Sequence, residues 1–124
     1  MAEPKKTVVL FDDSPLVLEA VEAALVARGF LVRAAETIGE LDRLLASSTP
    51  DLFVLDVQMP EAFGDDVGEV LRVVRKYEAP ILLYSSVDSA ELARRVEAAK
   101  LDGYASKDEG VDVLVNKVVE LLGP

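Results

Sequence analysis

The chain has 124 residues, 51% of them apolar, which fits one domain with one buried core. It contains no cysteine and no histidine, and this excludes disulfide bonds, thiolate chemistry, serine–histidine or cysteine–histidine pairs and imidazole metal ligands. Its formal net charge is −10, from 13 Lys and Arg against 23 Asp and Glu, which opposes binding to nucleic-acid phosphates, so we expect no direct nucleic-acid contact.

The sequence contains no segment that we expect to enter a membrane. No apolar run approaches the roughly 18 residues that a membrane helix needs. The lysines near the N-terminus are followed only by the apolar run Thr7–Phe11, which is too short for the hydrophobic region of a signal peptide. We therefore expect no membrane insertion and a cytoplasmic location.

Short apolar or β-branched runs alternate with longer segments of helical period along the whole chain. The predicted strands are Thr7–Phe11, Leu31–Ala35, Leu52–Leu55, Ile81–Ser85 and Gly103–Ser106. The first, third and fourth are nearly all apolar, as is typical of parallel strands covered on both faces. The second and fifth are more polar, so we expect them in more peripheral positions.

The segments between these runs have the spacing and the end signals of helices. The predicted helices are residues 16–27, a helix opening at the capping box Thr37-Ile-Gly-Glu40, a segment around Val67–Val74, residues 88–99 and residues 111–122. In the third of these, Val67, Val70, Leu71 and Val74 recur at i, i+3, i+4 and i+7. This spacing predicts that all four face the sheet.

The alternation predicts an α/β fold of (βα)5 type, with a doubly wound parallel five-stranded sheet and helices on both faces. In such sheets a ligand binds outside the carboxyl ends of the strands. The polar residues at those ends are Asp12, Asp13, Asp56, Ser85, Ser86 and Lys107.

Three carboxylates that converge on one cleft repel one another unless a cation offsets their charge. Ligation by oxygen alone suits a hard cation, and Mg²⁺ is usually held by one or two carboxylates, water and a phosphate oxygen. The sequence therefore predicts a magnesium site beside a phosphoryl group.

Each of these residues also has a simpler structural interpretation. Asp12 and Asp13 could cap the helix that begins near Pro15. Lys107 could be an ordinary solvated lysine, and Ser85 an ordinary loop hydroxyl. Their arrangement on successive strand ends favours the functional interpretation. By contrast, we expect the basic residues of segment 88–100 to form only a solvated helix face.

The motifs FDDSP, LDVQMP and GYASK follow three of these strands in this order. In this the chain resembles the receiver domains of response regulators in two-component signalling, the CheY-like superfamily. The resemblance covers about Thr7 to Leu122. It implies the flavodoxin-like strand order 2-1-3-4-5 and a single receiver domain over residues 1–124, with a core at about 6–122 and no effector domain within these residues.

The resemblance also implies a function. Asp56 would be the phosphoacceptor, taking a phosphoryl group from a sensor histidine kinase or a histidine phosphotransfer protein to form an aspartyl phosphate. The chain would catalyse its own phosphorylation and slow dephosphorylation and would not be a turnover enzyme. The resulting conformational change would alter the binding of a downstream protein partner.

The family's site residues map onto this chain position by position. Asp12, Asp13, Asp56 and the main-chain carbonyl of Gln58 would hold Mg²⁺, with Mn²⁺ as an alternative. Ser85 and Lys107 would bind phosphoryl oxygens, while the small Ser86 keeps access open. Ser85 and Tyr104 would form the switch, although an aromatic residue at a strand edge often does no more than pack.

One position departs from the family pattern. Most receivers have a proline after the lysine, in a cis peptide, whereas this chain has Lys107-Asp108. A cis bond before aspartate costs roughly 3 kcal/mol, so a trans peptide is predicted.

Two other functions were weighed against the phosphoacceptor. A module of the same fold used only for docking would not need all the acidic residues and the lysine, which this chain retains. A metal-dependent phosphohydrolase of the haloacid-dehalogenase type needs a second acid two residues after its nucleophile. This chain has Gln58 or Ser14 at those positions.

Overall fold

We describe a computed structural model in which residues 5–123 are placed. Residues 1–4 and 124 of the expected domain lie outside the described residues. The strands are β1 (Thr7–Phe11), β2 (Leu31–Ala35), β3 (Leu52–Leu55), β4 (Ile81–Ser85) and β5 (Gly103–Ser106). These are the strands predicted from the sequence.

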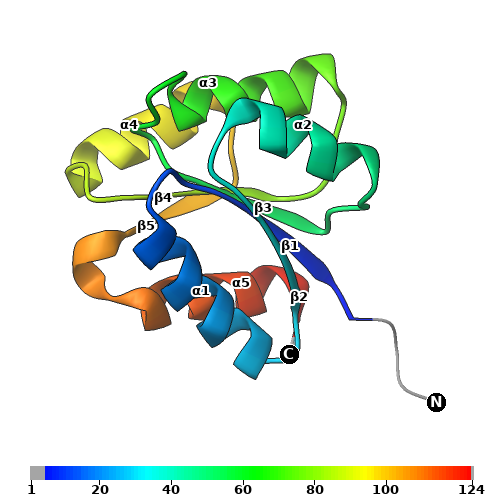
Figure 1. The fold of residues 1–124 in the computed structure, drawn as a ribbon. Coiled ribbons are helices and arrows are strands. Elements are labelled where there is room, and N and C mark those ends of the chain that lie inside the picture. The colour runs from blue at the N-terminus through cyan, green and yellow to red at the C-terminus, as the bar shows by residue number, and fades with distance from the viewer. Residues whose placement is uncertain (1–4, 124) are drawn as a thin grey trace.

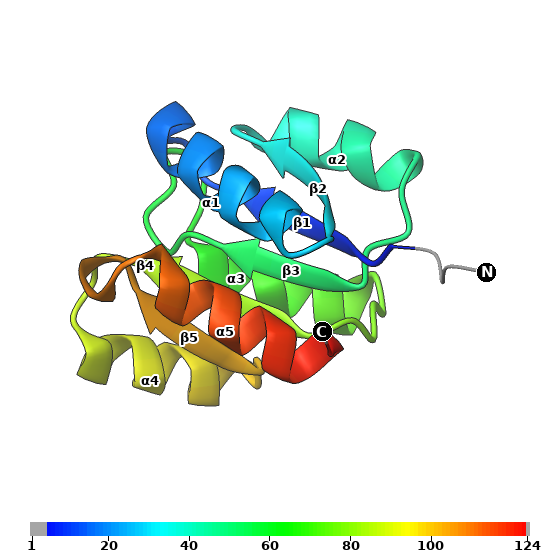
Figure 2. The ribbon, with the colours of Figure 1, turned by 90° about the horizontal axis from the view of Figure 1, so that it is seen from below.

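The helices alternate with the strands. They are α1 (Pro15–Ala27), α2 (Ile38–Ala46), α3 (Gly64–Glu69) with its π-helical continuation η1 (Val70–Val74), α4 (Ser89–Ala99), the short 3₁₀ turn η2 (Lys107–Glu109) and α5 (Val111–Leu122). Helices α1 and α5 cover one face of the sheet, and α2, α3 and α4 cover the other (Figure 1, Figure 2). None of the helices in residues 5–123 has the length and apolarity to cross a membrane.

The strands form one parallel sheet in the order β2-β1-β3-β4-β5, which confirms the predicted doubly wound fold. Strands β1, β3 and β4 are central and almost wholly buried, because helices cover both of their faces. Strands β2 and β5 lie at the edges and are partly exposed, as their composition predicted.

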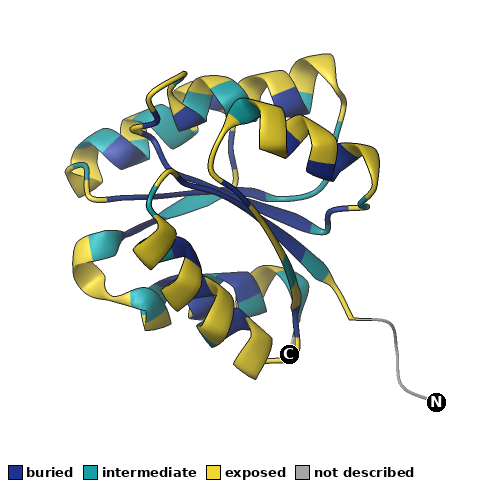
Figure 3. Cartoon of the chain, in the orientation of Figure 1, coloured by how far each residue is buried: buried dark blue, intermediate teal, exposed yellow. Residues whose placement is uncertain are grey.

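The core consists of two apolar clusters, one on each face of the sheet. Alternate residues of a strand point to opposite faces, so Val9 and Phe11 join the cluster under α2, α3 and α4, while Val8 and Leu10 join the one under α1 and α5. Figure 3 shows the same layering, with buried residues on the strands and the inward helix faces. The two clusters fix the sheet rigidly between its helices, and with it the carboxyl ends of the strands.

Helix α2 begins at the predicted cap. The Thr37 hydroxyl accepts a hydrogen bond from the Glu40 backbone N–H at 3.1 Å. The Glu40 carboxylate accepts from the Glu36 N–H at 2.8 Å, one residue earlier than the Thr37 N–H that a complete capping box would use. Half of the predicted capping box is therefore present.

The prediction that all four residues of the Val67 stripe face the sheet is wrong for two of them. Leu71 is buried and Val67 is partly buried, but Val70 and Val74 are exposed. For Val74 the cause is the π-helical turn of η1, in which the Arg75 N–H donates to the Val70 carbonyl, five residues back, at 3.0 Å. The wider turn shifts the phase of the helix, so the α-helical spacing no longer tells which residues face inward.

Candidate functional site

The predicted site residues converge at the carboxyl edge of the sheet. Asp12 and Asp13 follow β1, Asp56 follows β3, Ser85 ends β4 and Lys107 follows β5. These strands are consecutive neighbours in the sheet, so residues up to 95 positions apart in the sequence come into contact.

Asp12, Asp13 and Asp56 form a cluster of three carboxylates. One carboxylate oxygen from each lies within 4.8 Å of the others. Asp12 and Asp56 are only 5% and 6% exposed, whereas Asp13 is exposed. The backbone holds the two buried residues in place, since the Asp12 N–H donates to Ala35 and the Asp56 N–H donates to Phe11.

The interpretation of Asp12 and Asp13 as helix caps is wrong. Helix α1 is capped by Ser14, whose hydroxyl accepts from the Val17 N–H at 3.3 Å. Asp12 Oδ1 instead accepts from the Ser14 N–H at 2.9 Å, which orients its side chain. The other Asp12 oxygen, and the Asp13 carboxylate, remain directed to the cluster.

Lys107 is the cation at this site. Its Nζ donates to Asp12 Oδ2 at 2.7 Å and lies 3.4 Å from Asp56 Oδ2. Burial lowers the pKa of Lys107, but Asp12 and Asp56 outweigh this effect and raise the pKa above its ordinary value. Lys107 therefore stays protonated and offsets part of the negative charge. No peptide bond in residues 5–123 is cis, which confirms the predicted trans Lys107-Asp108 peptide.

The Asp56 carboxyl is the one whose charge is most disfavoured by its surroundings. Burial raises the pKa of Asp56, Lys107 lowers it, and the neighbouring charge of Asp12 raises it again, so that the net direction is upward. The Gln58 N–H, which donates to Asp56 Oδ1 at 3.3 Å, also lowers it. Ionised Asp56 is thus held in place by the fold although its burial opposes the charge.

The remaining predicted residues lie around this cluster. Ser85 is buried, its hydroxyl accepts from the Val87 N–H at 3.4 Å, and it also lowers the pKa of Asp56. Gln58 is exposed on the loop after Asp56. Tyr104 is half-buried against the apolar cluster under α4, with Lys117 Nζ 6.0 Å from its ring centroid. Tyr104 is the one predicted residue that lies away from the carboxylates.

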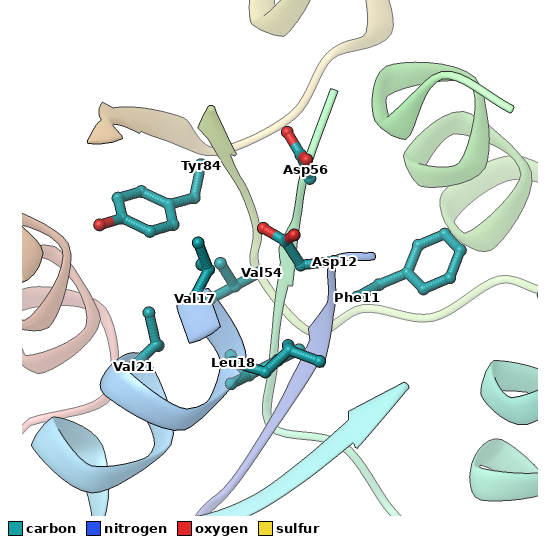
Figure 4. A pocket seen from close by; sticks show the side chains of 9 residues that line it. Phe11, Asp12, Val17, Leu18, Val21, Val54, Asp56 and Tyr84 are labelled. Carbon is teal, nitrogen blue, oxygen red and sulfur yellow. The ribbon is translucent and has the colours of Figure 1, made fainter. Parts of the chain in front are cut away.

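Two residues near the site were not predicted to matter there. Tyr84 is 6% exposed and places its ring 5.8 Å from Lys107 Nζ. It lines a small pocket with Asp12 and Asp56 (Figure 4). Gly64 lies against the backbone of Asp56, where an added Cβ would be 1.9 Å from the carbonyl oxygen. The only sequence signals were the aromatic residue before Ser85 and the glycine in the loop after LDVQMP.

The comparisons with known proteins agree with this geometry. The profile of the response regulator receiver domain family matches residues 8–119. The chain belongs to this family. The acidic pocket of Asp12, Asp13 and Asp56 is typical of the phosphoacceptor site of receiver domains in two-component signalling, and receiver domains are not turnover enzymes.

Two curated relatives are longer than this receiver domain. It is 33% identical over 106 residues to the transcriptional regulatory protein KdpE of Mycobacterium tuberculosis, covering 85% of this chain and 46% of KdpE. It is 36% identical over 123 residues to a gliding motility regulatory protein of Myxococcus xanthus, covering 97% of this chain and 16% of that protein. The chain thus spans less than half the length of either relative.

Solved receiver structures share the fold. The chemotaxis protein CheY4 of Vibrio cholerae superposes with a TM-score of 0.85 at 23% identity, over 96% of this chain and all of that one. TrrA of Thermotoga maritima, solved in complex with Mg²⁺-BeF, has a TM-score of 0.81 at 30% identity, over 94% of this chain and 99% of that one.

The raised pKa of Asp56 leads to a stability prediction for this receiver domain. Replacing Asp56 by asparagine keeps the shape and removes a buried charge, so we expect the free energy of unfolding to rise by about 1 kcal/mol at pH 7. The pKa of Asp56 in the folded wild type lies above the ordinary 3.8, so folding favours the protonated carboxyl. This contribution of Asp56 to wild-type stability is fully present below the unfolded-state pKa and is lost as pH rises through the folded-state pKa. The gap between Asp56→Asn and wild type should therefore open above about pH 4 and vanish below it.

Urea unfolding of both proteins at a series of pH values in metal-free buffer measures this gap. Asp66→Asn is the matched control, since Asp66 is exposed and its replacement should leave stability unchanged at every pH. An Asp56→Asn protein less stable than wild type at pH 7 would contradict the prediction.

Proposed function

We propose that Asp56 accepts a phosphoryl group from a histidine of a sensor kinase or phosphotransfer protein, in a reaction that depends on Mg²⁺. The observation that carries the proposal is the position of Lys107. Its Nζ lies 2.7 Å from Asp12 and 3.4 Å from Asp56, inside a cluster of three carboxylates. A solvated lysine or a structural aspartate would not be arranged in this way.

In this reaction a carboxylate oxygen of Asp56 attacks the phosphorus atom, and the bond from phosphorus to the donor's nitrogen breaks. The donor histidine belongs to the partner, because this chain has none. Phosphoryl transfer needs mainly positioning and stabilisation of charge. The backbone hydrogen bonds of Asp56 and Asp12 supply the positioning, and the ammonium of Lys107 supplies positive charge for a phosphoryl oxygen.

The donor set fits a hard divalent cation. Asp12, Asp13 and Asp56 present carboxylate oxygens to one point, and the chain offers no sulfur of cysteine and no imidazole that would favour a softer metal. These three residues, with the Gln58 carbonyl, would hold Mg²⁺ or Mn²⁺. A bound ion offsets the negative charge that the carboxylates and the phosphoryl oxygens bring together.

Ser85 and Tyr104 would convert phosphorylation into a change of shape. The Ser85 hydroxyl is already beside Asp56 and would donate to a phosphoryl oxygen. Tyr104 lies one strand away and packs between the core and Lys117. A local change in charge would in this way bias two packings of the β4–β5 edge and alter the affinity for a downstream protein partner.

The cellular setting belongs to the same proposal. The family implies a histidine kinase as partner, and we place the domain in the cytoplasm with no direct contact to nucleic acid. The whole chain, from residue 1 to residue 124, would act as one receiver domain whose output passes to a separate protein surface.

Intact-mass measurement tests the proposed function. With acetyl phosphate and Mg²⁺ the wild type should gain one phosphoryl group, and EDTA should abolish the gain. Asp56→Asn should show no adduct, whereas Asp66→Asn should behave as wild type. An unmodified wild type, or an undiminished adduct on Asp56→Asn, would refute the proposal.

A further inference from the structure

Three valines of η1, the continuation of α3, are exposed. Val70, Val73 and Val74 are 47%, 63% and 69% exposed. Beside them runs a largely apolar groove between α2 and α3, whose walls include Ile38 and Leu41. Single exposed apolar residues are ordinary, but several together beside an apolar groove mark an interaction site.

The π-helical turn contributes to the exposure of Val74. The widened turn lies between Val70 and Arg75, so it rotates Val74 away from Leu71, which is 2% exposed. Val70 stands at the start of the turn and, as the immediate neighbour of Leu71, points in a different direction. π-helical turns are rare and are often found at functional sites. The apolar pattern of this segment therefore serves two surfaces, the core of this chain and a partner.

The charges around the valines show which partner fits. Glu69 precedes the valines and Arg75 follows them. If a second copy of this helix packs antiparallel with Val70 opposite Val74, then Glu69 is opposite Arg75, because both pairs are placed symmetrically about Arg72. The two-fold axis makes the contact occur twice. The helix is thus complementary in charge to itself.

To make this contact, Arg75 has to exchange its present pair with Asp42 and its position over the Tyr77 ring. Among residues 5–123, Glu69 forms no ion pair, and Arg75 pairs only with Asp42, at 2.9 Å, where both side chains are exposed. A surface pair of this kind contributes little and can be exchanged. We infer that η1 with Glu69 and Arg75 forms the interface of a two-fold dimer with a second copy of this chain.

The dimer is expected to be weak. Three valines and one ion pair on each side form a contact that is smaller than a stable interface. For a contact of this size we expect a dimer Kd of about 100 μM to 1 mM. The net charge of −10 on each copy opposes association. At about 0.15 M salt this repulsion is screened beyond roughly 8 Å, while the close contact at η1 persists.

Sedimentation equilibrium up to about 1 mM protein, at that salt concentration, tests the inference. The wild type should associate to a dimer. Glu69→Arg and Arg75→Glu should each weaken association by at least about tenfold, since each places like charges opposite one another twice. An equimolar mixture of the two variants should associate again, because both contacts in the mixed dimer pair opposite charges. Glu22→Arg, the same charge change on exposed α1, should associate as wild type.

The surface must be apolar as well as charged. Val74→Asp should abolish association, and its exposure means that the variant keeps its fold, which a thermal unfolding curve checks. A wild type that stays monomeric over the whole range, charge variants that associate like wild type, or a mixture that does not associate would overturn the inference.

This inference does not depend on phosphorylation. The experiment uses unphosphorylated protein, and Asp56→Asn should dimerise as wild type does. A failure of the phosphoryl transfer test and a failure of the dimer test are therefore distinguishable.

Discussion

Replacing Gly64 by alanine is expected to lower the free energy of unfolding by about 3 kcal/mol. The added Cβ would lie 1.9 Å from the carbonyl oxygen and 2.7 Å from the carbonyl carbon of Asp56. Neither atom can give way cheaply, because both belong to the backbone between β3 and the site, and the Asp56 N–H is bonded to β1. The chain must therefore shift at Asp56, the proposed phosphoacceptor. Urea unfolding measures the loss.

Gly39→Ala is the matched control for this prediction. Gly39 lies in α2, and its added Cβ would meet only the Thr37 hydroxyl, at 3.9 Å. In a helix, alanine is favoured over glycine, so this variant should be more stable by about 0.5 kcal/mol. Glycine to alanine is thus expected to lower the free energy of unfolding at position 64 and to raise it at position 39. Equal stability of the Gly64→Ala protein and the wild type would contradict the prediction, because a Cβ at position 64 would then fit beside the Asp56 backbone.

Replacing Lys107 by methionine is expected to slow phosphorylation by acetyl phosphate about 100-fold. Methionine fills a similar space without the charge that stabilises the transferring phosphoryl group. The free energy of unfolding should also fall by about 2 kcal/mol at pH 7, because Asp12 and Asp56 then remain buried without a cation. The stability loss should shrink in acid, where protonation removes the charge from both carboxyls.

Time-resolved intact mass gives the rate, and urea unfolding at pH 7 and in acid gives the stability. Lys100→Met is the control, since Lys100 is exposed and distant from the carboxylates; it should leave both quantities unchanged. If Lys107→Met were phosphorylated at the wild-type rate, Lys107 would only balance charge in the resting protein and would have no part in the transfer.

The Gly64 and Lys107 substitutions test two separate requirements of the site, the close approach of the backbone and the presence of a positive charge. Gly64 lets the backbone of the β3–α3 loop approach Asp56, and Lys107 brings charge from β5. The site therefore depends on strand order as much as on the identity of its carboxylates.

The sequence predicted all five strands with their observed bounds, and the reason is local. Central strands of a doubly wound sheet are buried on both faces, so they appear as short, almost wholly apolar runs between helical segments. The site residues were predicted by the same reasoning, because parallel strands bring their carboxyl ends to one edge. Asp12 and Asp56 could be found without a structure, since each directly follows such a run, whereas Lys107 follows the more polar edge strand β5 and was found by its place in the alternation.

Contacts between distant segments could not be found in this way. The sequence does not show that Lys107 reaches Asp12 from β5, or that Asp12 accepts from the Ser14 N–H, because Lys107 and Asp12 are 95 positions apart. Nor does it show that Tyr84 lies beside Lys107. Such distances are decided by the packing of β4 against β5.

The sequence by itself determined the fold class and the residues at the edge of the sheet, because hydrophobic period and strand ends are properties of neighbouring residues. The strand order was implied only by the resemblance to receiver domains. Only the tertiary structure decided the phase of the helix after Gly64. At the start of this helix Gly64 closely approaches Asp56, and further along Leu71 is buried within a π-helical turn. Val70 and Val74 are exposed there, which the local spacing did not predict.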